Sequence, residues 1–361
     1  MKPDFRFLMN EATRLTRSGN LQAATAAIQA ALHGDNPGAS AAHDAGEIID
    51  VEMREVADGA PSAADDAETS AHKQPQRKPR EGQFISMHYG DGAAARDYKL
   101  YIPPGAGHRA LPLVVMLHGC TQDPDDFAAG TQMNGAALAQ DFFVLYPAQS
   151  RRANPQRCWN WFKHNHQGRG RGEPALLAGM TREVMSRYAV DRDRVYVAGL
   201  SAGAAMAAIL GDTYPDLYAA VGVHSGLAAG AASDLPSAMT AMRAGGMNLR
   251  SEARGIPTIV FHGDADATVH PANGSQVIAA TAGATAAVEQ EHVRKPGERA
   301  CTRQIHRALD GRIIAEHWLV HGGPHAWSGG SSLGSYTDEQ GPDATSEMLR
   351  FFFEHPRRTT S

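Results

Sequence analysis

One serine stands where the sequence predicts an activated hydroxyl group. Ser201 is the centre of Gly199-Leu200-Ser201-Ala202-Gly203, which follows the apolar run VYVA and precedes AAMAAIL, a strong helix former. A strand that turns sharply into a helix around Gly-x-Ser-x-Gly lifts the serine to the end of a sheet, beside helix N–H groups that favour negative charge. The alternative is an ordinary glycine-rich turn with Ser201 as the helix cap. The strand before the turn and the helix after it favour a nucleophile.

The partner acid is predicted at the end of a later buried strand. The run PTIVFHGDADATV at 257–269 is apolar as far as Phe261, and two carboxylates follow, Asp264 and Asp266. Parallel sheets place their ligand crevice at the carboxyl ends of the strands. We favour Asp266 as the acid, because the loop has by then turned back toward that edge. Asp264 is expected to hold the turn by accepting hydrogen bonds from backbone N–H groups.

His325 is the predicted general base. It lies in the glycine-rich loop GGPHAWSGG, which follows the last apolar run at 312–321. In this position the imidazole would take the proton of Ser201 and later return it to the leaving alcohol, while Asp266 fixes the tautomer and stabilises the cation. Such a mechanism requires no metal ion and no organic cofactor.

Three histidines, His317, His321 and His325, are spaced four residues apart. On a helix this spacing would align metal ligands. The surrounding residues alternate as in a strand, however, where four residues separate two side chains by about 13 Å. We therefore predict no metal site and interpret His317 and His321 as partly buried, hydrogen-bonded side chains.

Two backbone N–H groups are predicted to bind the oxyanion. The early apolar run LVVML ends at His118-Gly119-Cys120. In hydrolases with a serine on such a turn, an N–H of this loop joins the N–H of the residue after the nucleophile. Those donors would belong to Cys120 and Ala202, and Gly119 would let the chain approach closely.

The elements that must position these residues alternate between strand and helix. Strands are predicted at 84–89, 98–102, 111–117, 142–146, 194–198, 219–223, 257–261 and 312–321, and helices at 125–140, 172–188, 202–214, 274–282 and 344–353. Several strands are continuous apolar runs, which is typical of parallel strands buried on both faces. The order predicts an α/β domain over 83–356, with a mostly parallel sheet and helices on both faces.

Composition excludes several classes of protein. The 361-residue chain has a net charge of -5, whereas nucleic-acid binders carry a strongly basic face. No apolar stretch reaches the ~18 residues of a membrane span. Three cysteines, Cys120, Cys158 and Cys301, are too few for a disulfide framework. Cys120 and Cys158 either form a disulfide or are two reduced thiols, and the sequence does not decide between these alternatives.

Two N-terminal segments precede this domain. Residues 1–33 read as two short helices, a hairpin too small to bury a core alone. We expect it to dock on the main domain or on a partner; the alternative is a small helical appendage. Residues 34–82 are poor in large apolar side chains and are predicted to be a disordered linker. The charged N-terminus lacks the apolar core of a secretory signal, so we expect a cytoplasmic protein.

Several separate motifs, in the right order, resemble the poly(3-hydroxybutyrate) depolymerase family of esterases. They are LPLVVMLHGCTQ, CWNWF, RVYVAGLSAG, PDLYAAVGVHSG, HGDADATV and HGGPHAWSGG. The resemblance implies the α/β-hydrolase fold and ester hydrolysis by Ser201, Asp266 and His325, with Cys120 and Ala202 at the oxyanion hole.

The same resemblance leaves the substrate and the location open. It implies a short-chain polyhydroxyalkanoate polymer or its oligomers as substrate. Related members act on feruloyl or acetyl esters of plant polysaccharides, which is the alternative. Many members are secreted, so an extracellular location is the alternative to the cytoplasm. Under the same resemblance, the hairpin at 1–33 is a candidate for contact with a polymer granule or a partner protein.

Tryptophans near the predicted site are candidates for binding an acyl chain or an aromatic acid. Trp159 and Trp161 lie in CWNWF, and Trp327 follows the predicted base by two residues. A core position fits Trp159 and Trp161 equally well, whereas Trp327 is favoured as a pocket residue.

Overall fold

The structure, a computed structural model, describes residues 81–91, 95–246, 256–282 and 287–357. The chain divides into two units, Met1–Lys78 and Pro79–Ser361, and every described residue belongs to the second. The predicted helical hairpin at 1–33 lies outside the described residues, as does almost all of the predicted linker at 34–82. Both remain predictions.

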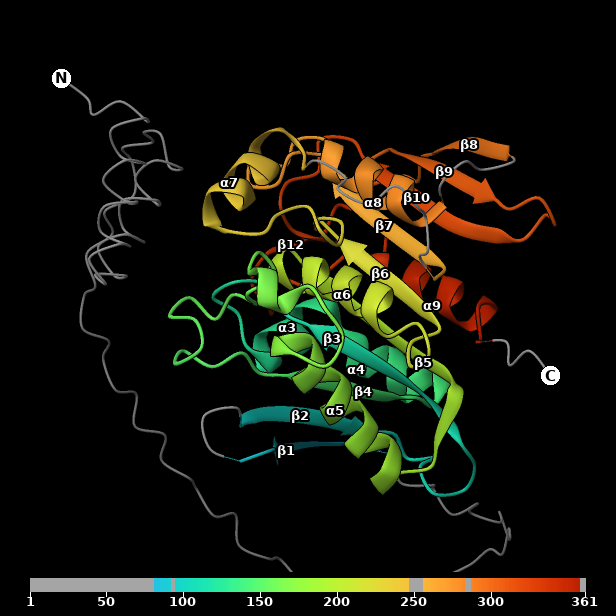
Figure 1. Ribbon diagram of the computed structural model, residues 1–361. Helices are drawn as coiled ribbons and strands as arrows, with labels where there is room; N and C mark the ends of the chain where they lie inside the picture. The colour runs from blue at the N-terminus through green and yellow to red at the C-terminus, as the bar shows by residue number, and fades with distance from the viewer. Residues whose placement is uncertain (1–80, 92–94, 247–255, 283–286, 358–361) are drawn as a thin grey trace, which may run out of the picture. The chain divides into compact units, whose positions relative to one another are not determined.

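One ten-stranded sheet runs through the described part of the second unit (Figure 1). In spatial order its strands are β1 (Gln83–Tyr89), β2 (Arg96–Ile102), β4 (Phe143–Pro147), β3 (Leu111–Leu117), β5 (Val190–Leu200), β6 (Ala220–His224), β7 (Thr258–Gly263), β10 (Ile313–Val320), β9 (Cys301–Arg307) and β8 (Ala287–Val293). The six strands from β4 to β10 pair in parallel, and the strands at both edges pair antiparallel. The sheet is therefore mostly parallel, as the sequence predicts.

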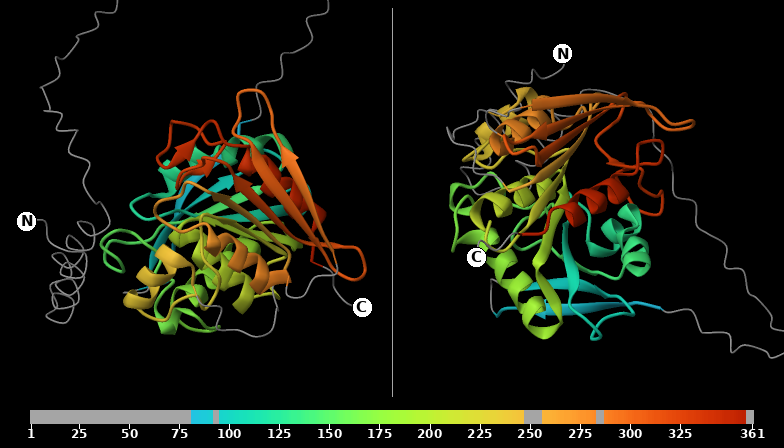
Figure 2. Two further views of the ribbon diagram at one scale, coloured as in Figure 1. Left: turned by 90° about the horizontal axis from the view of Figure 1, so that it is seen from above. Right: turned by 90° about the vertical axis from the view of Figure 1, so that its right-hand side faces the viewer.

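Helices cover both faces of this sheet (Figures 1 and 2). The helices are α3 (Pro124–Thr131), α4 (Met133–Gln140), α5 (Gly172–Arg187), α6 (Ala202–Thr213), α7 (Leu235–Ala244), α8 (Ala272–Ala282) and α9 (Ala344–Glu354). Residues of α5, α6, α7 and α8 share one buried apolar cluster, whereas those of α3, α4 and α9 share another. Strand β3 is apolar throughout because both of its faces are buried: Val115 belongs to the first cluster and Val114 to the second.

Two parts of the predicted order differ from the structure. The predicted helix at 125–140 is two helices, because Gln132 takes a left-handed conformation with φ 54° between α3 and α4. Strands β8 and β9 and helix α7 were not predicted. All seven residues of β8 are exposed or half-buried, so the apolar pattern that marks a buried strand is missing there.

The exposed edge strand β8 carries charge. Glu289 of β8 pairs with Arg307 of β9 at 2.9 Å, and Glu291 pairs with Arg303 at 3.2 Å. The cross-strand pairs fix the register of an edge that has little apolar area to bury. Among the described residues, no helix is both long enough and apolar enough to cross a membrane.

Three buried histidines, two on this sheet and one just after β3, predict sensitivity to mild acid. Burial lowers the pKa of His118 and of His317 to about 4, and that of His224 to about 3. In the unfolded chain these imidazoles titrate near pH 6.5. Between these values the unfolded chain binds more protons, so the free energy of unfolding falls as the pH drops below about 6.5.

We expect the loss between pH 7.5 and pH 5.5 to approach about 4 kcal/mol for the three histidines together. Urea unfolding at the two pH values measures it, and carboxylates contribute little in this window because they are ionised in both states. A His317→Gln variant should lose roughly a third of the pH dependence. Equal unfolding free energies at both pH values would contradict the prediction.

Candidate active site

Ser201 occupies the turn between β5 and α6. Its backbone has φ 56° and ψ −117°, a conformation that a residue with a side chain adopts at a cost. The Ser201 N–H donates to the carbonyl of His224 at 2.9 Å, and the Ser201 carbonyl accepts the N–H of Ala205 at 3.0 Å. The serine is thus held by β6 on one side and by the first turn of α6 on the other.

The glycines that flank this turn have no room for a side chain. A Cβ atom on Gly203 would lie 2.0 Å from the carbonyl oxygen of Leu117, and one on Gly199 would lie 2.5 Å from the carbonyl carbon of Gly203. The end of β3 therefore lies directly against the start of α6. The Gly-x-Ser-x-Gly spacing is a steric requirement of this contact.

The predicted acid and base are hydrogen-bonded to each other. His325 Nδ1 donates to Asp266 Oδ2 at 2.7 Å. The other oxygen, Oδ1, accepts the backbone N–H groups of Thr268 and Val269, both at 2.8 Å. The Asp266 side chain is fully buried and that of His325 is 12% exposed.

The electrostatics of this pair favour an ionised acid. Burial would raise the pKa of Asp266, but hydrogen bonds from His262 and His325 outweigh it and hold the pKa below its ordinary value. A buried carboxylate with this set of donors stays charged and fixes His325 with its proton on Nδ1. The Nε2 atom of His325 is then the basic one.

The neighbouring carboxylate, Asp264, has a different set of partners. Its Oδ1 accepts the N–H of Gly322 at 2.6 Å, and its Oδ2 accepts from His321 Nδ1 at 2.8 Å. His321 Nε2 lies 2.9 Å from the hydroxyl of Thr302. Asp264 therefore holds the loop that leads to His325, whereas the sequence predicts that it holds its own turn.

His224 connects the serine to the loop of the base, a role that the sequence did not reveal. Its carbonyl accepts the N–H of Ser201, while its Nε2 accepts the N–H of Ser328 at 2.9 Å. The buried ring is stacked with Trp327 at 5.1 Å between centroids. Accepting at Nε2 requires a neutral ring, and burial keeps it neutral. In the sequence this residue is only the last position of an apolar strand.

A second histidine, His262, stands behind the acid. Its Nε2 donates to the carbonyl of Val269 at 2.9 Å and lies 3.4 Å from Asp266 Oδ2. The ring is fully buried at the end of β7. The loop that carries Asp266 is thereby closed on the strand that precedes it.

The predicted oxyanion donors lie at two adjoining segments. Both neighbours of Cys120 have engaged N–H groups: Gly119 donates to Gln122 Oε1 at 2.9 Å and Thr121 donates to Gln156 O at 2.7 Å. Ala202 is the first residue of α6, where N–H groups have no partner within the helix. Their role as oxyanion donors stays a prediction that this placement supports.

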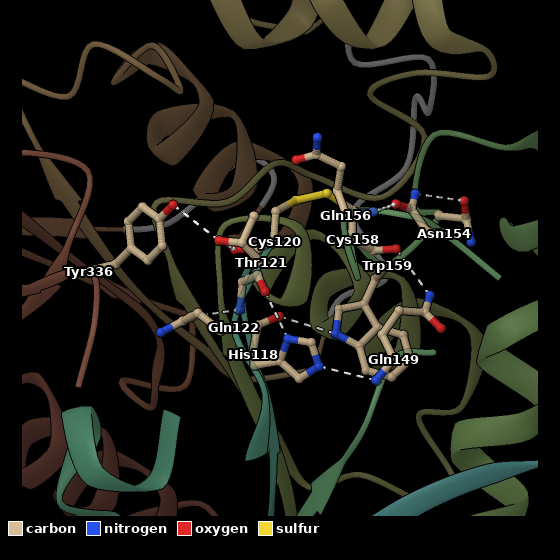
Figure 3. Close-up of a disulfide and its surroundings, with 12 residues drawn as sticks. His118, Cys120, Thr121, Gln122, Gln149, Asn154, Gln156, Cys158, Trp159 and Tyr336 are labelled. Carbon is tan, nitrogen blue, oxygen red and sulfur yellow. Dashed lines mark hydrogen bonds between the residues drawn. A yellow bond between two sulfur atoms is a disulfide. The ribbon is translucent and has the colours of Figure 1, made fainter. Parts of the chain in front are cut away.

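A disulfide joins Cys120 to Cys158 and so ties the oxyanion loop to the segment CWNWF (Figure 3). The Nε1–H group of Trp159 adds a second tie, because it donates to the carbonyl of His118 at 3.1 Å. The sequence left open whether these two cysteines are bridged. The remaining cysteine, Cys301, is buried and free, and burial raises the pKa of its thiol to about 11.

A buried network of hydrogen bonds also holds the segment CWNWF. Glu173, near the start of α5, accepts from the backbone and side chain of Asn160 at 2.7 and 2.6 Å, and from Gln149 at 2.5 Å. Gln149 in turn donates its backbone N–H to Nε2 of His118 at 3.1 Å. The loop that carries Cys120 is therefore fixed through both covalent and hydrogen-bonded links.

The three tryptophans that were candidates for substrate binding are buried. Trp159 and Trp161 are 0% and 5% exposed and belong to the apolar core. Trp327 is 1% exposed, packs edge-on against Phe127 at 5.5 Å and donates to the hydroxyl of Thr345 at 3.0 Å. This burial favours a core role, and the prediction that they line a substrate pocket gains no support from it.

One protein-family model matches the part of the chain that contains the predicted nucleophile and acid. Residues 96–304 match the family model described as esterase PHB depolymerase. The chain belongs to this family of esterases. The match contains the serine turn and the acid loop, while His325 lies beyond its end.

Relatives at the level of sequence include enzymes named for different esters. A poly(3-hydroxyalkanoate) depolymerase C from Paucimonas lemoignei is 35% identical over 49% of this chain and 46% of its own length. A feruloyl esterase B from Thermothelomyces thermophilus is 30% identical over 42% of this chain and 50% of its own. The chain thus spans about half the length of these two relatives.

The α/β-hydrolase fold is shared with solved structures of low sequence identity. An acetyl xylan esterase from Aspergillus awamori superposes with a TM-score of 0.58 at 19% identity, covering 74% of this chain and 99% of that one. The match covers nearly the whole of the other enzyme, so it concerns the overall fold and not a local motif.

Because the disulfide holds the oxyanion loop, we expect its removal to lower turnover. In a Cys158→Ala variant the oxyanion loop loses its covalent tie, and we expect kcat for p-nitrophenyl acetate to fall about 10-fold or more, short of the ~10²–10³ that loss of a donor costs. The free energy of unfolding should fall by about 2–4 kcal/mol. Cys301→Ala is the matched control, because it removes a thiol and keeps the disulfide. A Cys158→Ala enzyme that is folded and turns over like the wild type would refute this role.

The position of His224 predicts a positioning role with its own signature. A His224→Phe variant keeps the stacked ring but leaves the buried N–H of Ser328 without an acceptor, an arrangement that costs about 1–3 kcal/mol. We expect kcat for the same ester to fall about 10-fold with KM little changed. His224→Gln, which retains a carbonyl acceptor, should recover part of kcat. If both variants kept full kcat, the link between the serine and the loop of the base would be dispensable.

Proposed function

We propose that this chain is a serine esterase that hydrolyses carboxylic esters through an acyl-enzyme on Ser201. The observation that carries the proposal is the buried, hydrogen-bonded pair of Asp266 and His325, on the sheet edge where Ser201 is presented. The family membership supports the same reaction class.

In the proposed mechanism His325 Nε2 removes the proton of Ser201 as the hydroxyl oxygen attacks the ester carbonyl carbon. The carbonyl oxygen becomes negatively charged and is bound by the backbone N–H groups of Cys120 and Ala202. His325 then returns the proton to the leaving alcohol. A water molecule, activated by the same imidazole, releases the acid and regenerates Ser201. Asp266 stays ionised throughout and stabilises the imidazolium.

As substrate we propose the short-chain polyhydroxyalkanoate polymer or its oligomers. The relative named poly(3-hydroxyalkanoate) depolymerase C, at 35% identity, supports this choice. The second candidate is a feruloyl or acetyl ester linked to polysaccharide, which the feruloyl esterase match and the acetyl xylan esterase fold support. Both candidates use the same catalytic residues and differ in what surrounds them.

The location proposed for this reaction follows from the disulfide. The sequence predicts a cytoplasmic protein, whereas a disulfide persists mainly in oxidising compartments. Because Cys120–Cys158 ties the oxyanion loop, we propose that the enzyme works outside the reducing cytosol, which is the extracellular alternative. Contact of residues 1–33 with a granule or a partner stays a prediction.

The nucleophile and the substrate class are tested together by hydrolysis of p-nitrophenyl acetate, butyrate and octanoate, of ethyl ferulate and of amorphous poly(3-hydroxybutyrate). We expect cleavage of the short aliphatic esters and of the polymer, and a loss of nearly all turnover in Ser201→Ala. Cleavage of ethyl ferulate without cleavage of the polymer would favour the second candidate. Full activity of Ser201→Ala would overturn the mechanism.

The acid is tested by a matched pair of neighbouring carboxylates. Asp266→Asn should lower kcat by about 10⁴-fold, because the amide no longer fixes the reactive tautomer of His325. Asp264→Asn removes a carboxylate two residues away that holds only the loop, and it should lower kcat far less. Equal losses in the two variants would contradict the assignment of Asp266.

A further inference from the structure

The loop behind the predicted base exposes two large apolar side chains. It joins the short strands β11 (Trp327–Ser328) and β12 (Thr337–Asp338), which pair with each other. Leu333 is 84% exposed and Tyr336 is 46% exposed. The other large apolar side chains exposed among the described residues are Leu138, Val288 and Leu309. A single exposed leucine is ordinary, so its surroundings must decide what it does.

The loop is held firmly on helix α3. The N–H of Ser331 donates to the carbonyl of Gly130 at 2.8 Å, and the N–H of Ser335 donates to Asp126 Oδ1 at 2.7 Å. A Cβ atom on Gly334 would lie 2.4 Å from the backbone nitrogen of Gly130. Leu333 therefore projects from a fixed backbone, and binding to it requires little further ordering of the protein.

The same loop is bonded to the predicted oxyanion loop. The hydroxyl of Tyr336 lies 3.2 Å from Thr121 Oγ1, next to Cys120, and Figure 3 shows it pointing there. Gln122 Nε2 donates to the carbonyl of Ser335 at 3.0 Å. Tyr336 has φ 53°, a left-handed conformation that is strained for a bulky side chain. The fold keeps this strained tyrosine half-exposed beside the predicted site.

We propose that Leu333 and Tyr336, here called the apolar rim, contact the surface of a neutral aliphatic polyester while the chain being cleaved lies at Ser201. The inference rests on the proposed function and adds an adsorption site to it. Such a contact would hold an insoluble substrate next to the oxyanion loop, because Tyr336 of the rim is hydrogen-bonded to Thr121 of that loop.

Charge around the rim favours a neutral surface over an anionic membrane. The segment 329–341 contains two acidic residues, Asp338 and Glu339, and neither lysine nor arginine. Asp338 is paired with Arg299 at 2.7 Å, whereas Glu339 accepts the N–H of Ser332 at 3.0 Å. Anionic lipid attracts basic segments, so this rim opposes it. An uncharged polyester meets no such repulsion.

The test compares adsorption of the full chain to particles of amorphous poly(3-hydroxybutyrate), measured by depletion from solution, with hydrolysis of the same particles and of p-nitrophenyl butyrate. In Leu333→Ser we expect adsorption about 10-fold weaker, since one buried leucine contributes roughly that factor. The ratio of polymer hydrolysis to soluble-ester hydrolysis should fall with it. Leu309→Ser is the matched control, because Leu309 is 96% exposed in the turn between β9 and β10.

The outcomes separate this inference from the function on which it rests. Wild-type adsorption in Leu333→Ser, or an equal loss in Leu309→Ser, would overturn the rim. Preferential binding of the wild type to vesicles of anionic lipid would also overturn it. If the wild type adsorbs through Leu333 but does not cleave the polymer, the rim stands and the proposed substrate fails. If soluble esters are not cleaved either, the catalytic proposal itself fails.

Discussion

The contact between Gly203 and the carbonyl oxygen of Leu117 is the constraint on which the site depends. It brings the first turn of α6 against the end of β3, at a distance that excludes even a methyl group on Gly203. Because the chain continues from Leu117 directly into the loop of Cys120, the same contact places that loop beside the serine turn. The predicted oxyanion donors and the predicted nucleophile are thus neighbours for a steric reason, before any hydrogen bond is considered.

Hydrogen bonds between separate strands and loops position the acid and the base. The loop after β7 supplies Asp266, β7 itself supplies the buried His262 behind it, and the loop after β10 supplies His325. His224 on β6 connects that loop to the serine. A neutral imidazole suits the buried positions of His118 and His224, since the Nε2 atom of each accepts a backbone N–H group. Their neutrality has a cost, because the unfolded chain gains protons where the folded chain cannot.

Much of the fold could be predicted because parallel strands buried on both faces are apolar throughout, and β3 is the clearest case. The same reasoning missed β8, where no face is buried. The break at Gln132 was also missed, because a left-handed residue other than glycine leaves no sign in the sequence. For the site, the motif around Ser201 and the order of acid and base identified a set of residues whose acid and base are in contact.

What could not be predicted depends on contacts between distant segments. Spacing alone does not tell whether Cys120 and Cys158 meet, and the structure joins them. A tryptophan close to a catalytic motif in the sequence is a candidate for the substrate pocket, yet Trp159 and Trp327 are among the most buried side chains. Conversely, Tyr336 has no motif of its own, and its relation to Thr121 appears only when two loops 215 residues apart are folded together.

The charged strand β8 has a consequence for an enzyme that would gather on a solid surface. An edge strand offers unpaired backbone groups to any neighbouring copy, and crowding on a particle raises the rate of such encounters. Here the edge presents Glu289 and Glu291, each paired with an arginine of β9. A second β8 approaching edge to edge would bring like carboxylates together. The charges on β8 therefore disfavour edge-to-edge pairing of two copies through this strand.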